Sequence, residues 1–359
     1  MTLNPVQSNL RGRFPRYVAG GFDANDFERI LPGVTTWDSW VDACQVFGDE
    51  RIELAEDALE RGRPLSAGEA FVQAAILYHF AQIAYFESDE RKHRMEDQSV
   101  AAYKRGLALV DPPIERLEIP FDGIDLVGHL RMPTTGAQRP GCVFLLPGVD
   151  SSKEEMHTLE LVFLRRGIAT FAFEGPGQGE VRRVLPMIDD YERALSTAID
   201  ALQVRSGLDG DRIGVYGRSM GGYLAPKCAA HDDRIRAVVS AGGIYDLSYF
   251  DGIPEHVQHN FRNAWGLETL AEASRRARTV SLSGVVEQVR CPFLIVHSGH
   301  DKVFPPSGAY RMAEESTAPT QLVIYEEGTH VCDNITYKYR PLVADWMAEQ
   351  LAATVAATD

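Results

Sequence analysis

The sequence has no long hydrophobic run, since no uninterrupted apolar stretch reaches the roughly 18 residues that a membrane-spanning helix needs. The first residues also lack the basic stretch and apolar run of a secretory leader. Positive charge is scarce, because 36 Lys and Arg are set against 51 Asp and Glu, a formal net charge of −15. A field of that sign repels nucleic-acid phosphates and anionic lipid surfaces. We therefore expect a cytoplasmic protein that binds neither nucleic acid nor a membrane.

Cysteine is scarce and scattered as well. The five cysteines never occur in CxxC or Cys/His metal-binding spacing. They are Cys44, Cys142, Cys228, Cys291 and Cys332. The sequence therefore predicts neither a disulfide framework nor a metal site, and it indicates no cofactor. Most of the five stand in apolar stretches, where a reduced cysteine acts as a small core side chain. Cys332 differs, because it lies two residues after His330.

The chain is long for one ordinary domain, at 359 residues, so we expect a core with insertions or with a helical accessory region. The composition, 45% hydrophobic and 24% charged, is typical of folded proteins. Residues 24–110 have helical spacing, with a start signal at Thr36 and a stop signal at Gly62. Residues 67–86 are apolar on nearly every side, which predicts a helix buried among others.

After residue 114 the pattern changes to short apolar or alternating runs, and nearly all adjacent runs are separated by helix-sized segments. The predicted strands cover residues 116–120, 125–132, 143–146, 169–173, 213–216, 237–240, 293–297 and 322–325. This alternation predicts an α/β fold with a mostly parallel central sheet, helices on both faces, and ligands at the carboxyl ends of the strands.

One interval is too long for a simple crossover, because about fifty residues separate the strands at 237–240 and 293–297. Its aromatic content predicts a helical cap over the active edge of the sheet, and the alternative is a surface insertion with its own small core. The aromatic and histidine residues in it are Tyr245, Tyr249, Phe250, His256, Phe261 and Trp265, of which Tyr245, Phe250 and Trp265 are candidates for substrate contact. The predicted parts are an N-terminal helical region that contributes to the cap (1–114), a core (115–243 and 288–359) and the cap insertion (244–287).

The central motif is Gly-Arg-Ser-Met-Gly-Gly at residues 217–222, between the strand at 213–216 and a helix-like run. A sharp strand-to-helix turn strains the backbone at Ser219, and glycines two residues to either side remove the resulting clashes. The turn exposes the serine hydroxyl at a helix N-terminus, where the dipole favours developing negative charge. Strand, motif and helix in this order predict the α/β-hydrolase fold with Ser219 as the nucleophile.

A serine nucleophile needs a base and an orienting acid, which in this fold follow in the order serine, acid, histidine. Asp301 comes after the strand at 293–297, and His330 comes after the strand at 322–325. Because parallel strands end at the same edge of the sheet, we predict that Asp301 orients His330 and that His330 is the general base.

Other residues compete for these roles. Asp246, Asp251 and Asp333 are alternative acids, but Asp301 alone follows the strand just before the histidine strand. His300, next to Asp301, is expected to point the opposite way along its loop and to be a bystander.

The predicted oxyanion hole combines the backbone N–H of Met220 with one from the loop after the strand at 143–146. Pro147 cannot donate, which leaves Gly148 or Val149, and Val149 is favoured. A glycine-rich loop at 174–180 should lie at the same edge. Since no Lys-Ser/Thr follows it and no GxGxxG pattern precedes a helix, nucleotide binding is disfavoured.

Together, Ser-Lys-Glu-Glu at 152–155, Glu-Gly-Pro-Gly-Gln-Gly-Glu at 174–180, the motif at 217–222 and Arg340-Pro341 resemble the 2,6-dihydroxypseudooxynicotine hydrolase family. Fermentation-respiration switch proteins and fungal polyketide-shortening hydrolases are related to that family. The resemblance implies the serine triad without a cofactor, hydrolysis of a carbon-carbon bond next to a ketone, and N-terminal helices that help cover the active site. The family's extra cap carboxylate has no matching glutamate here, and Asp251 or Glu255 is the candidate replacement.

The sequence thus predicts a serine hydrolase acting on a small ketone, such as an aryl ketone, a β-diketone or a polyketide-like compound. A carboxylesterase or lactone hydrolase would use the same residues and differ only in its leaving group. An acyltransferase or cyclase would exclude water, and a ligand receptor without turnover is the non-enzymatic alternative. The apolar N-terminal helices favour a homodimer.

Overall fold

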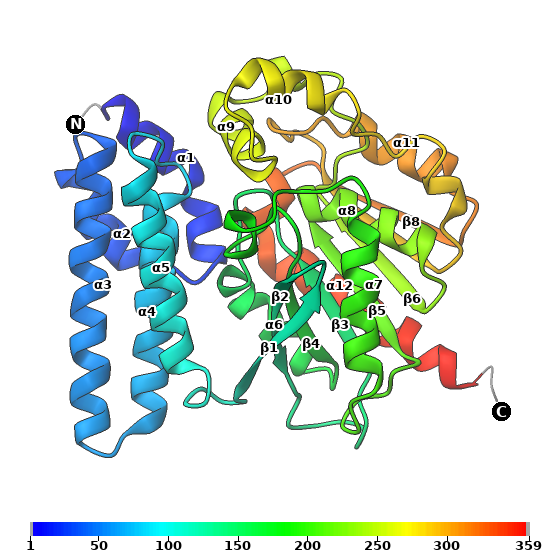
Figure 1. Ribbon diagram of the computed structural model, residues 1–359, viewed down its shortest axis with the longest axis horizontal. Helices are drawn as coiled ribbons and strands as arrows, with labels where there is room; N and C mark the ends of the chain where they lie inside the picture. The colour runs from blue at the N-terminus through cyan, green and yellow to red at the C-terminus, as the bar shows by residue number, and fades with distance from the viewer. Residues whose placement is uncertain (1–2, 357–359) are drawn as a thin grey trace. The chain divides into compact units, whose positions relative to one another are not determined.

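The computed structural model describes residues 3–356 and divides the chain into two compact units. The first is helical and comprises the described residues up to Glu115 together with Glu154–Thr158. The second comprises Arg116–Lys153 and the chain from Leu159 onward. Figure 1 shows the first unit as the blue and cyan helices and the second as the sheet with its surrounding helices.

The helical unit is built from α1 (Pro5–Ala19), α2 (Ala24–Ile30), α3 (Trp37–Glu60), α4 (Pro64–Gln82) and α5 (Asp89–Gly106). The start of α3 after Thr36 is as predicted, and Thr36 caps it by accepting from the Ser39 amide. The sequence reading, which began near residue 24, missed α1. Its signal is an Asn4–Gln7 capping box with Pro5 in the first turn.

The helix α4 is the buried centre of this unit, because it lies between α3 and α5 and nearly all its residues after Ala67 are buried. An aromatic cluster packs beside it, with the ring of Trp40 stacked on Tyr17 at 5.8 Å and on Phe22 at 5.9 Å. The indole N–H of Trp40 donates to the carbonyl of Phe80 at 3.2 Å. Apolar burial on all sides, as the sequence predicts, holds the unit together.

The second unit contains an eight-stranded sheet in the order β1-β2-β4-β3-β5-β6-β7-β8. The strands are β1 (Ile114–Phe121), β2 (Ile124–Arg131), β3 (Cys142–Leu146), β4 (Ala169–Glu174), β5 (Ile213–Arg218), β6 (Ile235–Ala241), β7 (Phe293–Ser298) and β8 (Thr320–Tyr325). β2 runs antiparallel to β4, whereas β3 to β8 run parallel to one another. All eight predicted strands are present, with ends that differ by at most two residues, which confirms the predicted fold class.

Helices cover both faces of the parallel strands, because β3, β4, β5 and β7 are buried at every position. The core helices are α6 (His157–Leu164), α7 (Tyr191–Gln203), α8 (Met220–His231), α11 (Ser307–Glu315) and α12 (Thr336–Ala356) (Figure 1). Because β3 to β8 are parallel, their carboxyl ends lie at the same edge of the sheet. Among the described residues, no helix has both the length and the apolar character that crossing a membrane requires.

The long interval between β6 and β7 contains α9 (Glu255–Ala264) and α10 (Leu270–Ala277), flanked by the short helices η4 (Phe250–Gly252) and η5 (Val286–Gln288). Tyr245, Phe250 and Trp265 were candidates for substrate contact, but they are only 2%, 2% and 6% exposed. The ring of Phe261 packs 5.9 Å from Phe250 and 5.0 Å from Trp265. These aromatic residues form the core of the insertion.

Candidate active site

Ser219 occupies a strained turn between β5 and α8, with φ 55° and ψ −118°. A side chain at Gly217 would place its Cβ 1.8 Å from the carbonyl oxygen of Gly221, and one at Gly221 would lie 2.1 Å from the carbonyl oxygen of Leu146. Both glycines are therefore required by close backbone approach, as the motif predicts. The Ser219 amide donates to the Ala241 carbonyl at 2.9 Å, which ties the turn to β6.

The three residues that the sequence singles out lie in one hydrogen-bonded chain. His330 Nε2 is 3.0 Å from Ser219 Oγ, and His330 Nδ1 is 2.7 Å from Asp301 Oδ2. The other oxygen of Asp301 accepts from the amides of Val303 at 2.8 Å and Phe304 at 3.1 Å. These contacts fix the carboxylate and direct the imidazole at the serine, as nucleophilic catalysis by serine requires.

The Asp301 carboxylate is charged although its side chain is fully buried. Burial raises its pKa, but the nearby charge of His330 and the hydrogen bonds from His330 and Val303 outweigh burial, so the pKa of Asp301 is lowered. His297, on β7, behaves in the opposite way, because burial lowers its pKa. The Asp301 carboxylate therefore places a buried negative charge next to His330.

The alternative residues lie elsewhere. Asp333 pairs with Arg218 at 2.8 Å, and Asp246 accepts from the amide of Ser248 at 2.9 Å. The side chain of His300 is 77% exposed and lies 3.6 Å from Glu326. Burial and then the nearby Asp333 raise the pKa of the Cys332 thiol to about 12, so this cysteine stays protonated.

The loop after β3 lies against Ser219, because a Cβ on Gly148 would be 3.3 Å from Ser219 Cβ. Buried Gln178 holds this loop by donating to the Pro147 carbonyl at 2.8 Å. The hydroxyl of Tyr191 in turn donates to Gln178 Oε1 at 2.5 Å. Val149, the predicted oxyanion donor, is two residues after Pro147 in this loop and is buried.

A buried charge network fixes the far end of the same loop. Glu174, at the end of β4, accepts from the backbone amide of Lys153 at 2.9 Å and from its Nζ at 3.2 Å. Lys153 Nζ also lies 2.6 Å from Glu180, which pairs with Arg116 at 2.7 Å. Burial opposes the charge of Glu180, but Lys153 and Arg116 lower its pKa. Gly179 leaves the room for this network, since a Cβ there would lie 1.9 Å from Glu174 Oε1.

These supporting residues were missed by sequence reasoning, which read residues 174–180 only as a tight glycine-rich loop. The available signal was a glutamate at the end of an otherwise apolar strand, because a buried charge requires a partner.

The insertion between β6 and β7 contacts this site through Asn260 and Phe261 of α9. Asn260 donates to Asp150, the neighbour of Val149, at 3.2 Å. The ring of Phe261 lies 6.5 Å from Phe304, whose ring meets the His330 imidazole edge-on at 5.3 Å. The insertion therefore packs beside both the loop after β3 and His330.

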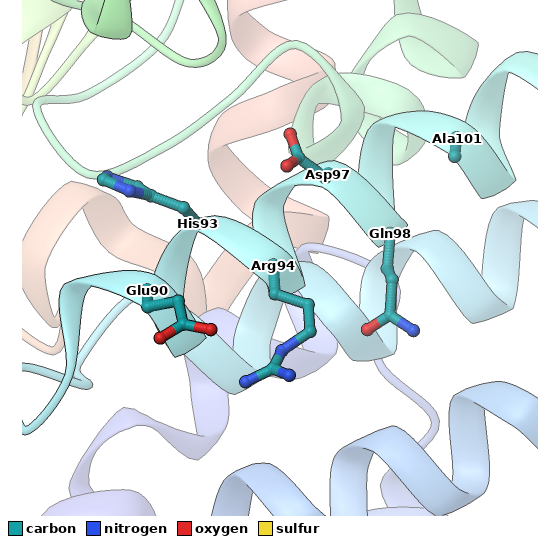
Figure 2. A pocket seen from close by; sticks show the side chains of 6 residues that line it. All are labelled: Glu90, His93, Arg94, Asp97, Gln98 and Ala101. Carbon is teal, nitrogen blue, oxygen red and sulfur yellow. The ribbon is translucent and has the colours of Figure 1, made fainter.

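Apart from these residues, a hollow of about 520 Å³ lies along α5 in the helical unit. Figure 2 shows its lining, Glu90, His93, Arg94, Asp97, Gln98 and Ala101, which recur at helical spacing on one mostly exposed face. It contains none of the residues described above. Within residues 3–356, no cluster of three or more histidine, cysteine or acidic side chains is arranged to hold a metal ion.

The sheet order, the strained serine turn after β5 and the helical insertion after β6 define an α/β-hydrolase. The chain matches the family described as esterase FrsA-like over residues 48–252, and the prolyl oligopeptidase family over residues 192–354. It belongs to the FrsA-like esterase family of these hydrolases.

Relatives with assigned reactions are similar over most of their length. The chain is 35% identical to 2,6-dihydropseudooxynicotine hydrolase of Paenarthrobacter nicotinovorans, covering 88% of this chain and 85% of the relative. It is 31% identical to 20-hydroxy-prefusarin hydrolase FUS2 of Gibberella moniliformis, covering 75% of each. The crystal structure of 2,6-dihydroxy-pseudo-oxynicotine hydrolase superimposes with a TM-score of 0.88 at 33% identity, covering 95% of this chain and 96% of that one. The resemblance stated from the sequence is thus confirmed, and the chain is a hydrolase.

Proposed function

We propose that this hydrolase uses Ser219 as nucleophile, His330 as general base and Asp301 as the orienting acid, and that it cleaves a carbon-carbon bond next to a ketone. The observation that carries the catalytic assignment is the continuous chain of contacts from Asp301 through His330 to Ser219, at 2.7 and 3.0 Å. Two hydrogen bonds in series orient the imidazole and aim its second nitrogen at the serine hydroxyl.

The reaction begins when Ser219 Oγ attacks the ketone carbon and His330 Nε2 accepts the hydroxyl proton. The backbone amides of Met220 and Val149 stabilise the oxyanion. When the tetrahedral intermediate collapses, the carbon-carbon bond breaks and His330 returns the proton to the leaving carbon. Water, activated by the same histidine, then hydrolyses the acyl-enzyme.

The leaving group defines the substrate class. A carbanion is a poor leaving group unless a second carbonyl or an electron-rich hydroxylated ring delocalises its charge. We therefore propose an aryl ketone, a β-diketone or a polyketide-like compound, supported by the likeness to a hydrolase named for dihydropseudooxynicotine. Both candidate cap carboxylates, Asp251 and Glu255, lie exposed, and Glu255 is 3.7 Å from His259. A carboxylesterase is the second candidate, favoured by the match to FrsA-like esterases.

The test is product identification by mass spectrometry on matched panels of simple acyl esters, hydroxyaryl ketones and β-diketones. Ser219→Ala should abolish turnover, since loss of the nucleophile in a serine protease lowers kcat on the order of 10⁶-fold. Ser206→Ala, at an exposed loop serine, is the matched control and should keep wild-type activity.

Serine-dependent cleavage of the ketones, faster than that of the esters, supports the carbon-carbon hydrolase. Turnover of esters alone would replace it with a carboxylesterase or lactone hydrolase, and products joined to a second substrate would indicate an acyltransferase or cyclase. Tight ligand binding without turnover, unchanged in Ser219→Ala, would refute the enzymatic proposal. A homodimer and a cytoplasmic location stay predictions.

A further inference from the structure

The backbone directly after His330 is strained. Val331 has φ 58° and ψ 13°, and Cys332 has φ 59° and ψ 27°, so two consecutive residues other than glycine adopt the left-handed conformation. For a β-branched residue such as Val331 this conformation is a true outlier. It persists only where the surroundings hold it, and such positions cluster at functional sites.

Most contacts of this loop are local or go to β7. Asn334 Oδ1 accepts from the Thr329 amide at 2.7 Å, and the Cys332 amide donates to the Thr329 carbonyl at 2.7 Å. Ser298 Oγ, at the end of β7, donates to the Gly328 carbonyl at 2.5 Å. These bonds shape the loop, but none of them reaches the turn that carries Ser219.

One ion pair does reach that turn. Arg218, the residue before Ser219, donates from Nη2 to Asp333 Oδ2 at 2.8 Å, and Asp333 lies three residues after His330. The two side chains are only 5% and 4% exposed. The pair therefore connects the turn that carries Ser219 to the backbone that follows Val331 and Cys332. Because both side chains are buried, water and salt screen their attraction only weakly.

Stability alone does not account for a pair in this place. Two charges lose hydration on burial, so a buried ion pair is often no more stabilising than apolar side chains of similar volume. The pair also has polar neighbours, Tyr216 and the buried guanidinium of Arg340. The charges of Arg218 and Asp333 both influence the pKa values of these two groups. What the pair supplies is a fixed geometry between two loops.

We propose that Arg218 and Asp333 are positioning residues, which hold the strained His330 loop against the nucleophile turn so that His330 Nε2 stays within reach of Ser219 Oγ. The inference rests on the proposed roles of Ser219 and His330. It adds two residues whose proposed role is to position His330 and Ser219.

The experiment compares wild type with Arg218→Met, Asp333→Leu and the double variant, in the full chain. Each single variant leaves one buried charge unpaired and should be less stable, whereas the double variant removes both charges and should regain much of that stability. The double variant should nevertheless remain about 10- to 100-fold lower in kcat with little change in KM, because a small misplacement of catalytic groups slows the chemical step. The rate at which a fluorophosphonate labels Ser219 should fall equally.

The matched control makes the same changes in an exposed pair, Arg290→Met with Asp233→Leu, and should keep wild-type kcat. A double variant that labels and turns over at the wild-type rate per titrated active site would overturn the inference, whatever its stability. A wild type that is not labelled at Ser219 would instead refute the proposed function and the inference with it, so the two failures are distinguishable.

Discussion

The Asp301 carboxylate is buried, yet its surroundings keep it charged. Because its native pKa lies below the ordinary value of about 3.9, the unfolded chain binds more protons in acid, and stability rises with pH in that range. Asp301 therefore contributes stability that is fully present above about pH 4 and is lost as the pH falls through its native pKa. We expect Asp301→Asn to flatten this acid dependence.

The measurement is the free energy of unfolding in urea from pH 6 down to the acid limit. The difference in free energy of unfolding between wild type and Asp301→Asn should become smaller as the pH falls. The kcat of Asp301→Asn at neutral pH should be lower on the order of 10⁴-fold, as for the equivalent change in a serine protease. Asp233→Asn, at an exposed aspartate, should follow the wild-type curve. A constant gap at all pH values would contradict the assigned charge state.

Among single residues, the sequence predicts best the positions of those that come directly after a strand, because the course of the backbone places them. Ser219, Asp301 and His330 each follow a strand of the parallel sheet, so the fold alone brings them to one edge. Gln178 and Glu174 lie at the same edge, but their contacts depend on how side chains cross between loops. No local pattern encodes that packing, and their roles had to come from the structure.

At the scale of elements, the loop after β3 is held at Pro147 by Gln178. In Gln178→Met the Pro147 carbonyl and the Tyr191 hydroxyl each lose a partner, which costs about 1–3 kcal/mol for each buried group left unpaired. The same loop carries the proposed oxyanion donor, so kcat should fall about tenfold or more. Urea unfolding and steady-state kinetics measure the two effects.

Gln203→Met is the control for this change. Gln203 also donates to a backbone carbonyl, that of Gly210 at 3.0 Å, but it lies at the end of α7. It should lose some stability and keep its kcat. If Gln178→Met also kept wild-type kcat, the loop would not depend on Gln178 for its catalytic geometry.

The elements themselves were largely predictable, because strand burial and helix capping leave local signals. All eight strands, the buried α4 and the helical insertion after β6 follow from such patterns. The left-handed pair Val331 and Cys332 does not, since neither residue type favours that conformation. Besides its local hydrogen bonds, the segment around this pair is bonded to Ser298 on β7 and to Arg218, and a local pattern cannot contain such distant contacts.

At the scale of the whole molecule, a short segment between β3 and β4 belongs to the helical unit and not to the unit that contains the sheet. Residues 115–243 were predicted to run in the core up to the cap, but Glu154–Thr158 belongs with the N-terminal helices. The partners of this segment lie between 54 and 139 positions earlier in the chain, too far for a local sequence pattern to indicate them. Thr158 Oγ1, for example, donates to the Ala19 carbonyl at 2.6 Å.

Glu155 is the charged centre of this segment and its side chain is fully buried. It accepts from Arg16 Nε and Nη2, both at 2.9 Å, and lies 3.0 Å from His79 Nε2. Glu155→Gln removes the negative charge and leaves Arg16 without its bidentate partner. Breaking a buried pair in this way costs on the order of 3–5 kcal/mol, so we expect lower stability in urea and faster amide hydrogen exchange in α1 and α4.

Glu28→Gln provides the matched control, because Glu28 also pairs with an arginine through both oxygens, Arg11, but in an exposed position of the same unit. Solvent and salt screen such a pair, so its loss should leave exchange in α1 and α4 unchanged. Equal effects of the two variants would mean that burial of Glu155 adds nothing to its ion pair. A selective effect of Glu155→Gln would instead show that the helical unit depends on the segment Glu154–Thr158, which lies between β3 and β4 in the chain. Neither unit would then be encoded by one continuous stretch of sequence.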